Sequence, residues 1–240
     1  MPEFLQSPAG RAVICVAVAV LAILIIELNY RWFFKTVFDA IFAFIAILIC
    51  SPVIAVCAVV SKCRAGSVLE KIPYLGKGGR IIYLTSFAGV CGALKNLPRL
   101  FDVLTGKMSF VGVIPLGIGD GALIDDDAMS RFNAKPGICC HLALNSYEGL
   151  AYEQIFSLDA RYARRRELFT DIVIVLKCAV LGVRGENREY LGEAKDKSYA
   201  QVLTERGVIT QEQADAALKA ANDLILKEAE RRTIKEDFER

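Results

Sequence analysis

The stretch TVFDAIFAFIAILICSPVIAVCAVV, residues 36–60, is apolar along almost its whole length, and its interruptions decide which fold it can form. Asp39 stands near its start and Ser51-Pro52 near its middle. Proline lacks a backbone donor and clashes with the preceding turn, so a helix here is expected to break or kink at Cys50-Ser51. The Ser51 hydroxyl is placed to satisfy the carbonyl that the proline frees.

Basic residues flank this apolar stretch on both sides, and they bear on its orientation in a membrane. In chain order they are Arg31, Lys35, Lys62, Arg64, Lys71 and Lys77. Because Lys and Arg concentrate on the cytoplasmic side of membrane segments, both ends of the stretch are expected in the cytoplasm. This pattern favours a re-entrant helix over residues 35–61, which enters from the cytoplasm, bends at Ser51-Pro52 and returns to the same face. A kinked spanning helix is the alternative.

A shorter apolar run covers residues 12–26 and lies between Arg11 and Glu27. It falls short of the roughly 20 residues that a helix needs to cross a bilayer, so it spans only if its flanking side chains reach toward the interface. A signal peptide is the alternative, but no Ala-x-Ala site precedes a polar mature start. We therefore expect an uncleaved N-terminal membrane anchor over residues 1–34.

The composition fits a chain with one lipid-facing and one water-facing part. Its 240 residues are 54% hydrophobic and its mean hydropathy is +0.39, which is high for a soluble domain. The formal net charge of +2 argues against a nucleic-acid partner, because tracking a phosphate backbone needs a concentrated basic patch.

The residue types that commonly bind metals are poorly placed to do so in this chain. None of the eight cysteines belongs to a CxxC pair. They are expected to be reduced and buried, in a globular part that lies in the cytoplasm. The acidic run at Asp120 and Asp125 to Asp127 lies among glycines and is expected to form a solvated loop, with cation binding as the alternative. We predict no metal site.

A helix is expected from about Ala151 to Val183, with one basic end and one strongly apolar end. Its basic residues are Arg161, Arg164, Arg165 and Arg166, and they are followed by the apolar run DIVIVLKCAVLGV. This pattern is typical of an amphipathic helix that lies on an anionic membrane surface. A half-buried helix with a solvated face is the alternative.

The sequence changes character beyond Gly192, where it becomes rich in Ala, Glu, Lys and Gln. Thr210 to Gln213 fits a capping box, which predicts a helix start. A helical apolar stripe follows, formed by Ala214, Ala217, Leu218, Ala221, Leu224 and Ile225. This helical extension, residues 191–240, is expected to mediate a homo- or hetero-oligomer or to dock on its own domain.

Five ordered blocks between about Lys35 and Lys177 resemble one known family. They are Phe38-Asp39 with Ser51-Pro52, GSVLEKIPYLGKGG (66–79), LKNLPRLFDVLTGKMSFVGVIP (94–115), MSRFNAKPGI (129–138) and LDARYARRRELFTDIVIVLK (158–177). In this order they resemble the bacterial sugar transferases, which are monotopic polyprenyl-phosphate phosphoglycosyl transferases. The extension beyond residue 190 lies outside the resemblance.

The resemblance implies a membrane-associated α/β fold. A re-entrant membrane helix would carry a small cytoplasmic α/β domain, residues 62–190, with amphipathic helices at the interface and the helical C-terminal extension. Members of this family lie at the bacterial inner membrane and contact its lipid, so the globular part is expected on the cytoplasmic face.

The resemblance also implies a reaction and a site. These proteins transfer a sugar-1-phosphate from a nucleotide sugar to a polyprenyl phosphate in exopolysaccharide, capsule or glycoconjugate assembly. An aspartate attacks the diphosphate, assisted by a neighbouring glutamate and Mg²⁺. The matching blocks place Lys135, Asp159 and Arg161 as candidate substrate-binding residues.

The chain departs from the family at the positions that carry this chemistry. Lys95 and Asn96 stand where the family has its Asp-Glu pair, and Ile114 stands where an arginine would clamp phosphate. We therefore predict a non-catalytic or impaired member, a pseudoenzyme that could partner an active relative. One alternative is an active transferase whose carboxylate has moved to Asp102, and only then would Mg²⁺ be required. The other is a structural membrane scaffold.

Overall fold

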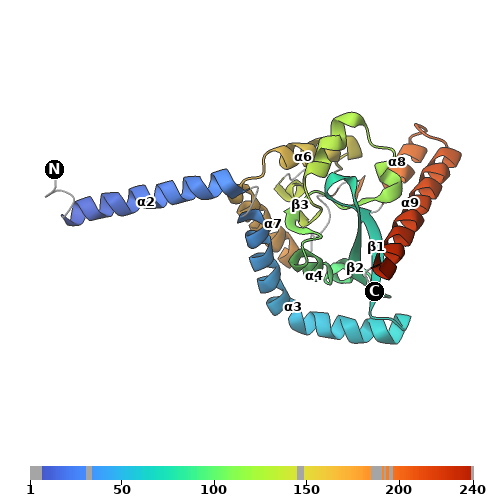
Figure 1. The fold of residues 1–240 in the computed structure, drawn as a ribbon, viewed down its shortest axis with the longest axis horizontal. Coiled ribbons are helices and arrows are strands. Elements are labelled where there is room, and N and C mark those ends of the chain that lie inside the picture. Colours follow the sequence, from blue (N-terminus) through green and yellow to red (C-terminus); the bar gives the residue numbers. More distant parts are fainter. Residues whose placement is uncertain are drawn as a thin grey trace.

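The computed structural model describes residues 7–30, 34–144, 149–184, 191, 193–194 and 197–238. Two helices precede a small α/β domain, and helix α2 projects away from it (Figure 1). Helix α2 covers Pro8–Asn29 and contains the predicted anchor run, residues 12–26. Its outward apolar side chains include Val13, Val16, Val18, Val20, Leu21 and Leu24, each more than half exposed.

Helix α3 covers Lys35–Ala65, 31 residues, with Pro52 inside it. It is continuous, but Figure 1 shows two arms that meet at a sharp bend in its middle part. The Ser51 hydroxyl donates to the Leu48 carbonyl, with 2.9 Å between the oxygens. That carbonyl is four residues before Pro52 and is the one that the proline leaves without a helical donor. The bend and this hydrogen bond are compatible with the predicted kink and the predicted role of Ser51.

Helix α3 also has the surface of a membrane helix. Among the described residues it is the one helix that is long and apolar enough to cross a membrane by length and composition. Only 11% of its apolar window is buried, whereas the core helix of a soluble protein would be mostly buried. Its exposed large apolar side chains are Val37, Ile41, Phe44, Ile45, Leu48, Ile49, Val53, Val56 and Val59.

An antiparallel sheet with strand order β2-β1-β4 follows α3. Strand β1 covers Leu69–Leu75, β2 covers Ile81–Phe87 and β4 covers Leu116–Gly117. Strands β1 and β2 form a hairpin around a 3-10 turn at Lys77–Gly79. The family-like block over residues 66–79 thus forms strand β1 and the turn that follows it.

A second, parallel pair joins β3, Ser109–Gly112, to β5, Gly137–Cys140. The two strands approach so closely that a Cβ built on Gly137 would lie 2.1 Å from the Gly112 nitrogen. Only glycine fits there, which explains why glycines stand at these two points of the sequence.

Short helices connect the strands and line the core. They are η3 Ala93–Asn96, α4 Arg99–Leu104, α5 Ile118–Gly121, η4 Asp126–Asn133 and η5 His141–Leu144. The core beneath the first arm of α3 is formed by buried apolar side chains from α3, α4 and both sheets, among them Ala43, Leu84, Leu100, Val103, Met108 and Val111.

Two helices replace the single helix expected over residues 151–183. Helix α6 covers Tyr152–Arg164 and α7 covers Leu168–Arg184, and the helical backbone ends at Arg165, with φ −126° and ψ 72°. The reason lies in Asp159 and Asp171, which are both fully buried. Twelve residues apart on one straight helix, they would point about 120° away from each other. The break lets each carboxylate enter its own buried cluster.

The C-terminal part forms α8, Tyr199–Glu205, and α9, Gln211–Phe238. The capping box predicted at the start of α9 is confirmed: Gln213 N donates to Thr210 Oγ1 and Thr210 N donates to Gln213 Oε1. Helix α9 runs along the domain beside α5 and β1 (Figure 1), and Ala221 is buried there. Docking on its own domain, one of the two predicted roles, is therefore observed.

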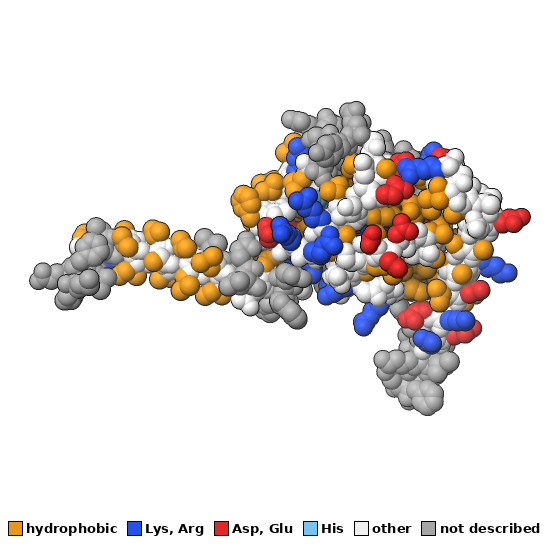
Figure 2. All heavy atoms as spheres, turned by 90° about the horizontal axis from the view of Figure 1, so that it is seen from above, with side chains coloured by type: hydrophobic (Ala, Val, Ile, Leu, Met, Phe, Trp, Pro, Cys, Tyr) orange, Lys and Arg blue, Asp and Glu red, His pale blue; other side chains and the backbone are white. Residues whose placement is uncertain are grey.

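Charges are unevenly distributed over the domain. Seen from above, Lys and Arg side chains gather on the part of the domain next to α2, and Asp and Glu side chains lie between them and α9 (Figure 2). The basic part thus adjoins the apolar helices, as expected for a domain beside an anionic membrane surface. The structure has no disulfide among the eight cysteines, but Cys15, Cys63 and Cys91 are exposed, so the expectation that the cysteines are buried is wrong for these three.

Candidate functional site

A cavity of about 570 Å³ opens between the first sheet, the η3–α4 segment, β5 and the end of α7. It is lined by Lys95 and Asn96 from η3 and by Ile114 from the loop after β3. These three residues are the ones that depart from the family pattern, and the fold brings them to one place. The positions of the expected dyad and of the expected phosphate clamp therefore share a single cavity.

The cavity carries two cations, each held by a neighbour on strand β1. Lys95 Nζ lies 2.8 Å from Glu70 Oε1, and both side chains are more than a third exposed. Arg99 Nη2 donates to the Tyr74 hydroxyl at 3.1 Å, and its guanidinium carbon lies 5.1 Å from the centre of the Tyr74 ring. Arg99 was not singled out from the sequence, although a second basic residue one helical turn after Lys95 was a usable signal.

Two polar groups in this cavity have hydrogen-bonding capacity to spare. Arg99 Nε is buried and has no hydrogen-bond partner within the described part of the chain. Asn96 Oδ1 accepts a long hydrogen bond, 3.5 Å, from Ser86 Oγ. A guanidinium N–H and a side-chain amide are both suitable donors to phosphate oxygens.

The residues of this cavity do not fit the Mg²⁺ ion that the family uses. None of its described lining residues is Asp or Glu. Magnesium requires oxygen ligands, chiefly carboxylates, and would be repelled by two adjacent cations. Across the described residues there is no group of three His, Cys, Asp or Glu side chains able to hold a metal ion.

Asp102 lies outside the cavity. Its carboxylate is buried and accepts hydrogen bonds from Thr85 N at 2.6 Å and from Thr85 Oγ1 at 3.1 Å, with Lys107 Nζ at 3.4 Å. Segment η3 ends at Asn96 and α4 begins only at Arg99, so Lys95 and Asp102 do not share one regular helix. The carboxylate fastens α4 to β2.

Asp159 is likewise internal. It is fully buried, with Oδ2 at 2.7 Å from Arg131 Nη2 and 3.2 Å from the backbone nitrogen of Ile114. Burial raises the pKa of Asp159 to about 6, against the opposing effect of Arg131. Because it holds Ile114 N, this carboxylate positions the turn that borders the cavity without reaching into it.

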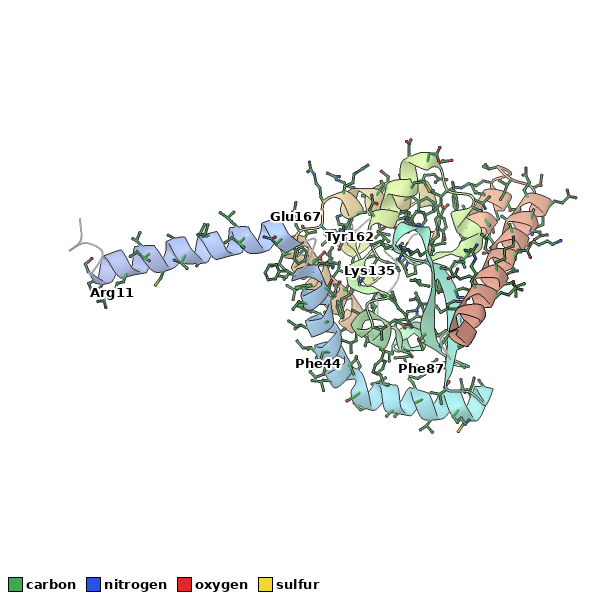
Figure 3. The ribbon with its side chains drawn as sticks, viewed as in Figure 1. Arg11, Phe44, Phe87, Lys135, Tyr162 and Glu167 are labelled. Carbon is green, nitrogen blue, oxygen red and sulfur yellow. The ribbon has the colours of Figure 1, made fainter. Side chains whose placement is uncertain are left out.

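Neither of the other two candidate substrate-binding residues lines the cavity. Lys135 is half-buried beside β3, where burial lowers its pKa and the charge of Asp39 opposes that effect. Arg161 is exposed on α6. Figure 3 shows Lys135 and Tyr162 where α3 meets the domain. Arg11 on α2 and Phe44 on the first arm of α3 lie away from that junction.

A buried polar cluster joins α3 to the domain, and its composition was not predicted from the sequence. Lys35 Nζ binds Asp39 Oδ1 at 2.9 Å and Asp171 Oδ2 at 2.7 Å. Ser109 donates to Asp39, and Tyr162 donates to Asp171 at 2.8 Å. The available signal was the pair of aspartates in the first and last family-like blocks. Asp39 and Asp171 each stand at a family-like position, and their meeting at Lys35 brings the two blocks into contact.

Three thiols also line the cavity. Cys139 and Cys140 from β5 and Cys178 from α7 all line it. A hydrogen bond with Cys178 and then burial raise the pKa of the Cys139 thiol well above its usual range. The Cys139 thiol therefore stays neutral, and the charged side chains among the described lining residues are Lys95 and Arg99.

Comparison with known proteins supports the resemblance that the sequence blocks carry. Residues 91–185 match the family described as Bacterial sugar transferase. The chain is 29% identical over 85 residues to the exopolysaccharide production protein ExoY of Rhizobium meliloti, covering 35% of this chain and 38% of that protein. It is 31% identical over 110 residues to the uncharacterized sugar transferase EpsL of Bacillus subtilis, covering 46% and 51%.

A third relative is the undecaprenyl-phosphate galactose phosphotransferase of Salmonella typhimurium, 31% identical over 116 residues, covering 48% of this chain and 23% of that protein. The segment that carries Lys95, Asn96 and Ile114 is thus similar to the bacterial sugar transferase family. It spans between about a quarter and about half the length of these relatives.

Proposed function

We propose that this chain is a non-catalytic bacterial sugar transferase that binds a phosphate-bearing ligand, a nucleotide sugar or a polyprenyl phosphate, without transferring a phosphosugar. It would act in exopolysaccharide, capsule or glycoconjugate assembly at the cytoplasmic face of the inner membrane. The observation that carries this proposal is the cavity at the dyad position, which is cationic and has no carboxylate among its described lining residues.

The chemistry of the two replaced positions supports the loss of transfer. A lysine side chain is protonated at neutral pH and has no free electron pair with which to attack phosphorus. An asparagine amide donates and accepts hydrogen bonds but does not act as a base. The alternative of a relocated carboxylate at Asp102 has no support in its packing, since that side chain is buried against Thr85 outside the cavity.

For the membrane part, we propose that α3 is re-entrant and that α2 anchors the chain. The bend of α3 and its exposed apolar faces support this arrangement. Contact with a second protein through α9 is a further proposal, supported by Leu218, Leu224 and Leu226, which are each more than half exposed although α9 packs on the domain.

The proposal is tested by a transfer assay on the full chain in detergent with Mg²⁺, undecaprenyl phosphate and a panel of radiolabelled UDP-sugars. The Salmonella typhimurium relative serves as the positive control. We expect label in the lipid fraction with the control and none with this chain. Label transferred by this chain, and lost in Asp102→Asn, would establish the relocated carboxylate instead.

A further inference from the structure

We infer that the cavity binds a diphosphate without a divalent cation, and that Glu70 competes with the diphosphate for Lys95. The inference deepens the proposed function and rests on it. In place of a metal ion, Lys95 and Arg99 supply the positive charge, and Asn96 supplies a neutral donor beside them. The carboxylate of Glu70 acts as an internal stand-in for a phosphate until the ligand arrives.

The charge balance of the cavity is the first step. Each phosphate of a nucleotide sugar carries one negative charge at neutral pH, and enzymes commonly balance that charge with Mg²⁺. Here the lining residues offer an ammonium and a guanidinium but no described carboxylate that could hold a cation. A magnesium ion bound to the diphosphate would meet these cations and lose binding energy. The metal-free diphosphate is the better match.

The geometry of Arg99 is the second step. Its guanidinium is fixed by the hydrogen bond to the Tyr74 hydroxyl and by its place 5.1 Å from the Tyr74 ring centre. Its Nε is buried and without a partner in the described part of the chain. That buried nitrogen is shielded from the cavity, so a ligand would meet the terminal nitrogens of the guanidinium. A planar guanidinium held in one orientation is suited to the paired hydrogen bonds that phosphate oxygens accept. Lysine could not reproduce this arrangement.

The Lys95–Glu70 pair is the third step. The two atoms lie 2.8 Å apart, and the two side chains are 37% and 39% exposed. Exposed ion pairs contribute little to stability, so this pair opens at little cost. A diphosphate can replace the single carboxylate of Glu70 at Lys95 and contact Arg99 as well. Glu70 thus lowers the affinity of the cavity for a diphosphate, and it holds the Lys95 side chain in place until the diphosphate binds.

Titration calorimetry with UDP as the probe tests this on the full chain in detergent, in excess EDTA and in millimolar Mg²⁺. We expect UDP to bind at least as tightly in EDTA as in Mg²⁺, so that the Kd in EDTA is no higher than the Kd in Mg²⁺. Lys95→Gln and Arg99→Lys should each weaken binding about tenfold, the loss expected for one charge-assisted hydrogen bond. Glu70→Gln should tighten binding severalfold. Lys71→Gln, also exposed on β1 but not lining the cavity, should change nothing.

A double variant sharpens the test of Glu70. If Glu70 acts by competing for Lys95, then Glu70→Gln has no effect on UDP binding once Lys95→Gln is present. Thermal unfolding of every variant in the same detergent shows whether it is folded, and Arg99→Gln replaces any Arg99→Lys protein that is not.

The outcomes separate this inference from the proposed function. Binding of UDP only in Mg²⁺ overturns the inference and leaves a non-catalytic binding protein in place. Absence of UDP binding in both conditions overturns the inference and removes nucleotide sugars from the proposed function. Transfer of a phosphosugar in the assay above overturns the proposed function, whatever the metal dependence of binding.

Discussion

Lys35 Nζ lies 2.7 Å from Asp171 Oδ2, so the first turn of the membrane helix α3 is bound to α7 inside the protein. The same ammonium binds Asp39 at 2.9 Å and the Val111 carbonyl at 2.9 Å. One buried lysine thus binds two buried aspartates and contacts strand β3. This cluster is a buried polar contact between the first turn of α3 and the domain, and Ser61 makes another near the end of α3, where its hydroxyl donates to the Ala88 carbonyl.

Replacing this lysine should therefore be costly. Lys35→Met leaves two buried carboxylates without their cation, and breaking a buried ion pair in this way costs about 3–5 kcal/mol. Thermal unfolding in detergent measures the loss. Lys71→Met removes an exposed lysine of the domain and should leave the midpoint unchanged. Equal midpoints for Lys35→Met and the native chain would mean that the cluster does not hold α3.

The close approach of β3 and β5 makes a second prediction. Gly137→Ala would place a Cβ 2.1 Å from the Gly112 nitrogen, which the backbone cannot accommodate without separating the two strands. We expect a loss of several kcal/mol, in the range of severe overpacking, or no folded protein. Gly119→Ala is the matched control, because its nearest contact would be an ordinary 3.6 Å to Leu218. A folded Gly137→Ala protein of native stability would contradict the strand pairing.

These contacts show which parts of the fold are readable from the sequence. The kink of α3 and its serine were predictable because Pro52 removes one particular donor and Ser51 is adjacent to the freed carbonyl. The start of α9 was predictable for the same local reason, since a capping box lies within four residues. The break between α6 and α7 was not, because it satisfies partners of Asp159 and Asp171 that lie far away in the sequence.

The residues of the candidate site also fall into those that the sequence could identify and those that it could not. Lys95, Asn96 and Ile114 could be identified by comparing residues with a family pattern, and the fold places them in one cavity. The partners that set their chemistry could not, because Glu70 and Tyr74 lie on a strand more than twenty residues earlier. Asp102 was a candidate only by its position along the chain, and tertiary packing directs its carboxylate to Thr85.

The proposed re-entrant topology predicts the side from which each end of α3 can be labelled. In a background without other cysteines, Thr36→Cys and native Cys63 stand near the two ends of the helix, and both positions are exposed. A membrane-impermeant thiol reagent should label both in inside-out vesicles and neither in right-side-out vesicles. Ser7→Cys, beyond α2, should show the reverse. Labelling of Thr36→Cys and Cys63 from opposite sides would establish a spanning helix.

The proline is the element that this topology requires. Pro52→Ala restores a backbone donor for the Leu48 carbonyl and removes the clash, so the helix should straighten. A straight helix of 31 residues is long enough to cross the roughly 30 Å hydrocarbon core. We therefore expect Cys63 to become labelled in right-side-out vesicles. Unchanged labelling in this variant would show that packing on the domain, and not Pro52, holds the bend.

The raised pKa of Asp159 predicts a pH dependence of stability. Its carboxyl binds a proton up to about pH 6 in the folded protein but only up to its usual value of 3.8 when unfolded. The folded state therefore holds the extra proton between these values, and stability falls as pH rises from about 4 to about 6. Across the window this fully buried group accounts for up to about 3 kcal/mol.

The measurement compares unfolding midpoints of three proteins between pH 4 and pH 7. Asp159→Asn does not titrate, so it should lack this part of the slope, although the loss of the ion pair with Arg131 lowers its stability above about pH 6, where the native carboxyl is ionised. Asp126→Asn, an exposed aspartate, should keep the native slope. A native slope in Asp159→Asn would assign the pH dependence to another group.

Rebuilding the acidic pair should change how the cavity handles metal before it changes catalysis. Lys95→Asp with Asn96→Glu places two carboxylates beside Glu70, which now pairs with Lys95, and gives the cavity the oxygen ligands that Mg²⁺ needs. Binding of UDP should then be at least about tenfold weaker in EDTA than in Mg²⁺, since repulsion by the new carboxylates is relieved only by the cation. Lys71→Asp, a charge reversal on β1 at a residue that does not line the cavity, should keep the metal-independent binding of the native chain.

Phosphosugar transfer is not expected from the Lys95→Asp, Asn96→Glu double variant, because Ile114 still offers no guanidinium to the diphosphate. Equal UDP affinity in EDTA and in Mg²⁺ would show that positions 95 and 96 do not govern the charge of the site.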